Sequence, residues 1–184
     1  HEHTDHTGGA NFLLANLKVD WVGVPEIGEN LVQGDWVKVF SPEVIGEFRT
    51  LKAGDKIELD SDAWLEVLAP GRVLSGTHSD PNNNSLVLLL HYQGKTVLLT
   101  GDIEEEGMIE LLEMGWDMSA DLFKIPHHGS RFSLYRPLLD SIEPQAVFIS
   151  VGKNNFGHPN QEILNYWSER QIPMYRTDDY GTVR

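Results

Sequence analysis

The stretch "SLVLLLHYQGKTVLLTGD" (85–102) constrains the fold of this 184-residue chain more than any other. It contains two apolar runs of strand-forming residues joined at Gln93-Gly94, a pair typical of a tight β-turn. It ends on Asp102, a carboxylate placed directly after a strand, where binding and catalytic groups often gather. The stretch therefore predicts an antiparallel hairpin inside a sheet, with a candidate functional residue at its end.

The rest of the pattern predicts a layered fold of the α/β (α+β) class. Strands are expected over 20–24, 56–60, 64–70, 120–126, 145–150 and 173–177. Apolar residues at helical spacing predict helices over 104–115, within 133–142 and over 160–171. A β-meander followed by strand–helix alternation indicates helices packed on a sheet. Because the length fits one domain and no linker is visible, we expect a single domain over 1–184.

The composition narrows the classes of function. Hydrophobic residues make up 40% of the chain and charged residues 23%, and no apolar run reaches the roughly 20 residues of a membrane span. The net charge of −14 argues against a protein that coats nucleic acid with a basic surface, although bound cations can reverse the field at one site. Because the chain has no cysteine, a metal site has to use His, Asp, Glu or carbonyl ligands, which favours zinc or manganese.

Four polar clusters carry candidate chemistry. The chain opens with "HEHTDHTGG", whose H-x-H-x-D-H spacing supplies ligands for two cations, unless it is a solvated terminus or a tag remnant. "TGD" places Asp102 either as a carboxylate shared by two cations or as a helix cap. "KIPHHGS" offers His127 and His128 as a ligand or a surface pair, and "NNFGHPN" holds His158 in a loop.

Together these stretches resemble the metallo-β-lactamase superfamily and, within it, the nuclease-like domain of competence DNA-uptake channel proteins of the ComEC type. "HEHTDHTGG" matches the H-x-H-x-D-H-x-G-G signature at every defining position. "NNNSLVLLLHYQGKTVLLTGD", "KIPHHGSRFS", "ISVGKNNFGHP" and "YRTDDYG" resemble the ComEC branch in order and spacing. The resemblance covers essentially the whole chain and implies a four-layer αββα sandwich, whose N-terminal strands are missing from this chain.

The resemblance also implies two divalent metal ions, Mn²⁺ or Zn²⁺, as cofactors, and no organic cofactor. The implied metal ligands are His1 and His3 on one ion, Asp5, His6 and His127 on the other, and Asp102 between them. Asp5 is also expected to orient the attacking hydroxide. His158 is expected to stabilise charge on the phosphate or to protonate the leaving oxygen.

The chain departs from the family in "DPNNNS" (80–85), where the family places a third histidine on the first ion. Asn84 is expected to offer a carbonyl oxygen to the metal or a donor to a phosphate, unless His78 folds in. The other expected substrate contacts are Ser85, His128, Ser130, Arg131, Lys153 and Asn155. The acids at 104–106 are expected to form the solvated start of a helix.

The leading hypothesis is a metal-dependent phosphodiesterase that hydrolyses DNA, single-stranded more than double-stranded, during uptake in natural transformation. Its expected partners are DNA and a membrane-channel part of the same parent protein. The chain itself is then expected to be a soluble, extracytoplasmic domain of a membrane protein. The alternatives are a small-molecule hydrolase of the lactonase or thioesterase type, and a non-catalytic DNA-binding module whose first metal site has decayed.

Overall fold

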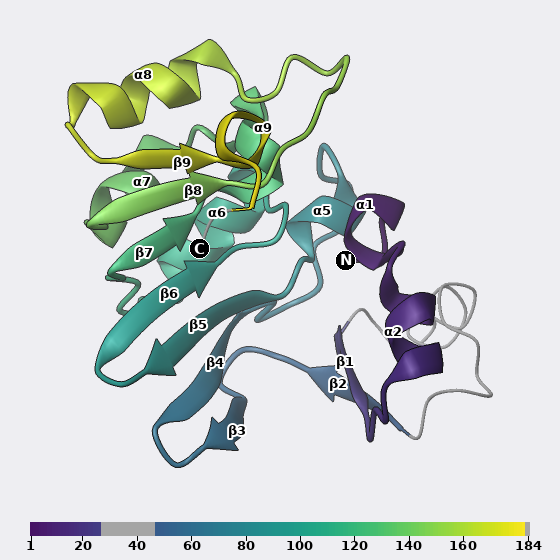
Figure 1. Cartoon of the computed structure of the whole chain (residues 1–184). Coiled ribbons are helices and arrows are strands. Elements are labelled where there is room, and N and C mark those ends of the chain that lie inside the picture. The colour runs from purple at the N-terminus through teal and green to yellow at the C-terminus, as the bar shows by residue number, and fades with distance from the viewer. Residues whose placement is uncertain (27–46, 183–184) are drawn as a thin grey trace.

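The computed structural model describes residues 1–26 and 47–182, which form a seven-stranded sheet and a separate two-stranded sheet (Figure 1). The strands of the large sheet lie in chain order: β3 (Lys56–Asp60), β4 (Ala63–Ala69), β5 (Val87–Tyr92), β6 (Lys95–Leu99), β7 (Leu122–Lys124), β8 (Ala146–Ile149) and β9 (Met174–Arg176). The small sheet pairs β1 (Val22–Pro25) with β2 (Phe48–Leu51) in parallel. The predicted α/β class and the predicted strands of the large sheet are confirmed.

The direction of pairing changes in the middle of the large sheet. Strands β3 to β6 are antiparallel neighbours, whereas β6 to β9 are parallel neighbours. Gln93 and Gly94 join β5 to β6 with positive φ angles of 49° and 75°, the backbone that a two-residue hairpin turn requires. The parallel strands are connected through three helices, α6 (Glu105–Glu113), α7 (Arg136–Ile142) and α8 (Gln161–Glu169), each of which the sequence predicted.

These three helices cover one face of the large sheet (Figure 1). Phe123 of β7 is fully buried and its ring centroid lies 5.7 Å from that of Trp167 on α8. Leu111 of α6 and Ile142 of α7 belong to the same buried cluster. Burial of such large side chains contributes roughly 1.5–3 kcal/mol each, so this layer fixes the strands whose ends carry the functional loops. Within the described residues, no helix is both long and apolar enough to span a bilayer.

Several short helical segments were not expected from the sequence. They are α1 (Thr4–Thr7), α2 (Ala10–Asn16), α5 (Asp80–Asn83), η1 (Pro126–Gly129), η2 (Arg131–Ser133) and α9 (Thr177–Tyr180). Helices this short are marginal on their own and depend on tertiary contacts, so periodicity does not reveal them. Figure 1 shows α1 and α5 side by side at the edge of the sheet where β6 to β8 end.

Asn83 attaches α5 to the start of α6. Its buried Oδ1 accepts hydrogen bonds from the backbone N–H groups of Glu104 and Gly107, at 3.0 and 2.9 Å. Its Nδ2 donates to Thr77 Oγ1 and to Glu106 Oε2. A side chain from the Asn-rich loop therefore satisfies two amides at the N-terminus of α6, where the helix itself offers no acceptor.

We expect Asn83→Ala to lower the free energy of unfolding by about 1–3 kcal/mol, because two buried N–H groups lose their acceptor. Urea denaturation measures this loss. The exposed Asn155→Ala serves as the control and should leave the midpoint unchanged. Equal midpoints for both variants would contradict the capping role of Asn83.

Candidate metal centre

Asp102 lies in the turn that follows β6 and is only 2% exposed. Three imidazoles from two distant segments surround its Oδ2 atom. The Nε2 atoms of His6, His128 and His1 lie at 2.9, 3.4 and 3.7 Å from it. Since β6, β7 and β8 are parallel, the loops that follow them meet at one edge of the sheet, and the opening motif reaches the same edge (Figure 1).

The opening motif presents its side chains from a single turn. The backbone N–H groups of His6 and Thr7 both donate to the carbonyl of His3 at 3.0 Å, which closes α1. The ring of His1 lies 4.8 Å from that of His3 and 4.2 Å from that of His6, between centroids. The motif histidines therefore gather beside Asp102, which is not expected of a tag remnant or a solvated terminus.

Ser85 holds two members of this group in place. Its fully buried hydroxyl lies 2.9 Å from His1 Nδ1 and accepts a hydrogen bond from the Asp102 backbone N–H at 3.2 Å. The prediction that Ser85 contacts substrate is wrong, because both contacts orient the metal-ligand candidates. With Nδ1 of His1 occupied in this way, its Nε2 is left to face Asp102.

The most compact group of possible ligands combines Asp5, His6, Asp102 and His128, whose ligand atoms all lie within 4.8 Å of one another. His128 Nδ1 lies 2.6 Å from the Ser150 carbonyl, and its Nε2 lies 3.1 Å from Asp5 Oδ2. His128 was predicted to contact substrate, yet it stands where the resemblance placed His127. The adjacent residues diverge because both have left-handed φ angles, 48° at His127 and 54° at His128.

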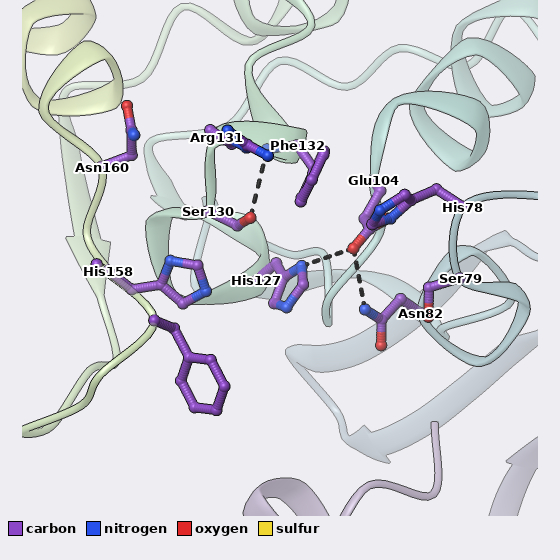
Figure 2. A pocket seen from close by; sticks show the side chains of 12 residues that line it. His78, Ser79, Asn82, Glu104, His127, Ser130, Arg131, Phe132, His158 and Asn160 are labelled. Atoms are coloured by element: carbon purple, nitrogen blue, oxygen red, sulfur yellow. Dashed lines mark hydrogen bonds and ion pairs between the residues drawn. The ribbon is translucent and has the colours of Figure 1, made fainter.

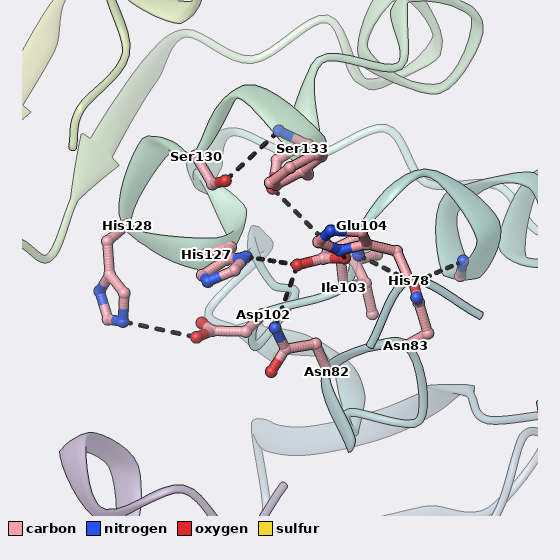
Figure 3. Close-up of polar contacts among 12 residues, drawn as sticks. His78, Asn82, Asn83, Asp102, Ile103, Glu104, His127, His128, Ser130 and Ser133 are labelled. Atoms are coloured by element: carbon pink, nitrogen blue, oxygen red, sulfur yellow. Dashed lines mark hydrogen bonds and ion pairs between the residues drawn. The ribbon is translucent and has the colours of Figure 1, made fainter. Parts of the chain in front are cut away.

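His127 instead lies beside a buried carboxylate, Glu104. His127 Nδ1 is 3.0 Å from Glu104 Oε1, and His78 Nδ1 is 2.7 Å from Glu104 Oε2 (Figure 3). Asn82 Nδ2 also donates to Glu104 Oε1 at 3.1 Å. Glu104 is 1% exposed, so the expectation of a solvated acid at this position is wrong. A carboxylate on one ring nitrogen fixes the imidazole and leaves the other nitrogen for a cation.

The Asn-rich loop contributes through Asn82 and not through Asn84. The Asn84 side chain is buried and hydrogen-bonds to backbone on both of its ends, with Leu74 N–H, Leu74 C=O and Asp80 C=O. The prediction of a metal or phosphate contact for Asn84 is therefore wrong. Asn82 lines the clefts around Asp102, and its buried Oδ1 has no hydrogen-bond partner in the described part of the chain. His78 does not reach the first site, because it pairs with Glu104.

His158 is held against the η1 turn by close packing of two loops. Gly129 has φ 78°, and a Cβ atom there would come within 2.7 Å of Pro159 Cβ. The Asn160 backbone N–H also donates to the Gly129 carbonyl at 2.8 Å. The ring of His158 consequently lies 5.5 Å from that of His127, between centroids, as expected for a residue that faces the centre from the opposite loop.

Two adjoining clefts open onto these groups. The Asp102 cleft has a volume of ~690 Å³ and is lined by residues that include Glu2, His3, Asp5, Asn82, Asp102, His127, His128 and His158. The Phe132 cleft has a volume of ~630 Å³ and is lined by residues that include His78, Asn82, Glu104, His127, Ser130, Arg131, Phe132 and His158 (Figure 2). Both volumes fall in the range of small-ligand sites. Asn82, His127 and His158 border both clefts.

Of the remaining residues predicted to contact substrate, three line a cleft and one does not. Ser130 and Arg131 line the Phe132 cleft, although the Ser130 hydroxyl is buried and accepts from the Phe132 N–H. Lys153 lines a smaller neighbouring cleft with Asp5 and His128. Asn155 is exposed and lines none of these three clefts.

The electrostatics leave Asp102, His127 and His158 in the form that binds a cation, whereas His128 has to release a proton first. Burial by itself would raise the pKa of Asp102, but contacts with His128 and His6 hold that pKa well below its usual value. The same contact with Asp102 raises the pKa of His128 to about 9. Burial lowers the pKa of His127 and of His158. At neutral pH Asp102 is therefore ionised. His127 and His158 are neutral, which is the form of an imidazole that binds metal.

Buried polar atoms without a hydrogen-bond partner indicate that these residues fit a divalent cation. Within residues 1–26 and 47–182, His1 Nε2 and Asp102 Oδ1 are buried without a hydrogen-bond partner. A buried polar atom left in this way costs about 1–3 kcal/mol, which a bound cation would offset. Imidazole and carboxylate donors without thiolate suit Zn²⁺ or Mn²⁺.

Comparison with known proteins identifies the class that this fold and centre define. The sequence model of the metallo-beta-lactamase superfamily matches residues 1–153, and the chain belongs to that superfamily. A solved structure from Parabacteroides distasonis, assigned as a metal-dependent hydrolase, superposes with a TM-score of 0.51 over 89% of this chain and 78% of that one. The two sequences are 15% identical, so this similarity supports the fold alone.

Several relatives of the chain are competence proteins. The chain is 32% identical over its full length to ComE operon protein 3 of Bacillus subtilis and 26% identical over its full length to Recombination protein 2 of Haemophilus influenzae. It is 29% identical over 57% of its length to Competence protein ComA of Neisseria gonorrhoeae. These relatives are of the ComEC type, which confirms the predicted resemblance. The chain spans 23%, 21% and 16% of their respective lengths.

We expect Glu104→Gln to weaken Mn²⁺ binding by about 10–100-fold, because the orienting carboxylate of His127 loses its charge. Asp102→Asn, which removes a direct ligand, should weaken binding at least as much. Calorimetric titration of metal-free protein measures both. The exposed neighbour Glu105→Gln is the matched control and should bind like the parent. If Glu104→Gln also bound like the parent, Glu104 would have no role in holding the metal ligands.

We also expect two cations to load in separate steps. The Asp5–His6–Asp102–His128 group is compact, whereas His1 and His3 add only two imidazoles to the shared Asp102. Fewer ligands give lower affinity, and the affinity of both sites falls at acidic pH, because each site uses two imidazoles for which protons compete with the metal. Titration with Mn²⁺ at pH 7.5 and pH 6 should show two unequal events, and His3→Ala should remove only the weaker one. Two events of equal affinity would contradict this assignment.

Proposed function

We propose that this chain is a metal-dependent phosphodiesterase that cleaves DNA, with a preference for single strands, during DNA uptake. The observation that carries the proposal is the Asp102 centre, where a buried carboxylate and three imidazoles open into a cleft faced by a further histidine, His158. The competence function named for the relatives ComE operon protein 3 and ComA supports DNA as the substrate.

Each group of the chain has a definite task in this reaction. Divalent ions held at Asp102 and its imidazole neighbours would polarise the phosphodiester and lower the pKa of a water molecule. Asp5 is more than half exposed at the mouth of the cleft, where its carboxylate accepts a hydrogen bond from the attacking water. His158 is neutral and donates a hydrogen bond to a phosphate oxygen as negative charge develops there.

The relatives support a setting for the reaction. Because the chain spans less than a quarter of each competence protein described above, we place it in a larger membrane-associated protein whose channel part handles the same DNA. In this arrangement the domain works outside the cytoplasm and degrades the strand that is not taken up. Manganese and zinc are both compatible with its ligand set.

The test is hydrolysis of a labelled single-stranded oligonucleotide with Mn²⁺ or Zn²⁺. Cleavage should stop with EDTA and in Asp102→Asn, while His158→Ala should lower kcat by about 10²–10³-fold with its metal content unchanged. His91→Ala is a suitable control, because His91 stacks on Trp64 in the β4–β5 pair away from the centre.

A lactone and a thioester substrate complete the panel. Turnover of either one without cleavage of DNA would overturn the proposal in favour of a small-molecule hydrolase. Binding of DNA without hydrolysis under all metal conditions would favour a non-catalytic module.

A further inference from the structure

Phe156 is the most exposed large hydrophobic residue in the described part of the chain, with 83% of its surface accessible. An exposed phenyl ring contributes nothing to the core, so its presence at the rim of a cleft indicates a role in binding a ligand. It lines the Phe132 cleft, the Asp102 cleft and the small cleft of Lys153. Its ring is near parallel to that of His158, with 24° between planes and 5.9 Å between centroids.

The loop that carries Phe156 is built to present it. Asn154 Oδ1 accepts hydrogen bonds from the backbone N–H groups of Phe156 and His158, at 3.0 and 3.1 Å. Its Nδ2 donates to the carbonyls of Gly152 and His158. Four hydrogen bonds from one side chain thus fix the loop, and the exposure of the ring is a consequence of that geometry.

A second aromatic surface lines the same cleft. The ring of Phe132 lies 4.1 Å from that of His78, between centroids, with 33° between planes. Arg131 Cζ lies 4.7 Å from the centre of the Phe132 ring and brings a positive charge to the rim. Figure 2 shows Phe132, Arg131 and His158 around this cleft, with His127 between His158 and Glu104.

The acidic group in this cleft is already committed. Glu104 contacts His78, Asn82 and His127, so its carboxylate is not available to bind a cationic ligand. What remains on the walls is aromatic rings, an arginine and small polar groups. Aromatic side chains with an arginine are the surfaces on which bases of single-stranded nucleic acid stack.

We infer that the Phe132 cleft is a nucleobase subsite, in which Phe156 and Phe132 stack on an unpaired base of the strand whose phosphate lies in the Asp102 cleft. This inference rests on the proposed function, which it deepens by giving a reason for strand preference. A base can enter the cleft only when it is unstacked and unpaired, so a duplex is excluded unless it opens. The subsite accepts any base, because stacking does not depend on the base-edge pattern.

The test compares Phe156→Ala and Phe156→Trp with the parent protein on single-stranded oligonucleotides in Mn²⁺. Phe156→Ala should lower kcat/KM roughly tenfold on a normal strand, and Phe156→Trp should restore it. On a strand with one abasic residue beside the scissile phosphate, the parent and Phe156→Ala should be equal, because there is no base to stack. Tyr92→Ala, which removes another exposed aromatic at the hairpin end of β5, is the control.

A binding readout separates this inference from the proposed function. Stacking quenches the fluorescence of 2-aminopurine, so a strand carrying it should darken on mixing with the parent, before cleavage, and much less with Phe156→Ala. Quenching without any hydrolysis would remove the nuclease proposal and retain the base subsite. Hydrolysis with equal quenching and equal kcat/KM in the parent, Phe156→Ala and Tyr92→Ala would overturn the subsite. Quenching by an intact duplex as strong as by a single strand would overturn its selectivity.

Discussion

The contact between the Asp102 carboxylate and three imidazoles is the interaction on which the rest of the site depends. A buried carboxylate is costly unless it is paired, and here the pairing groups arrive from the opening turn and from the loop after β7. The helices α6 to α8 pack on one face of the sheet and fix the parallel strands. The sheet therefore fixes the positions of the loops, and the imidazoles that these loops carry surround Asp102.

A second buried carboxylate extends this organisation away from the centre. Glu104 links His127 to the Asn-rich loop and to His78, while Asn83 of the same loop caps α6 at Glu104. The loop that lacks the family's third histidine thus supports the site structurally. Asn82 is the member of this loop that lines the clefts.

The sequence predicted the hairpin and the three helices that cover the large sheet, because periodicity and turn residues act locally. The ligand candidates around Asp102 were implied by the family resemblance and not by periodicity. Prediction from sequence failed where the outcome depends on tertiary packing. Glu104 carries the pattern of a solvated helix start, yet the histidines that bury it lie 26 residues before it and 23 after it. The choice between His127 and His128 depends on two consecutive left-handed residues, a conformation that is uncommon for any residue other than glycine and that the sequence pattern does not locate. Asn82 and Asn84 are indistinguishable by composition.

The two clefts share Asn82, His127, Phe156 and His158 as a common wall, and this wall has a thermodynamic consequence. A ligand in one cleft restricts the side chains that border the other, so under the proposed function cation binding and strand binding would be linked equilibria. Linkage is reciprocal: if a bound strand raises the affinity for a cation by some factor, the cation raises the affinity for the strand by the same factor. Under the proposed function, this acidic domain would bind DNA tightly only while its cations are bound, and loss of the cations would release the strand.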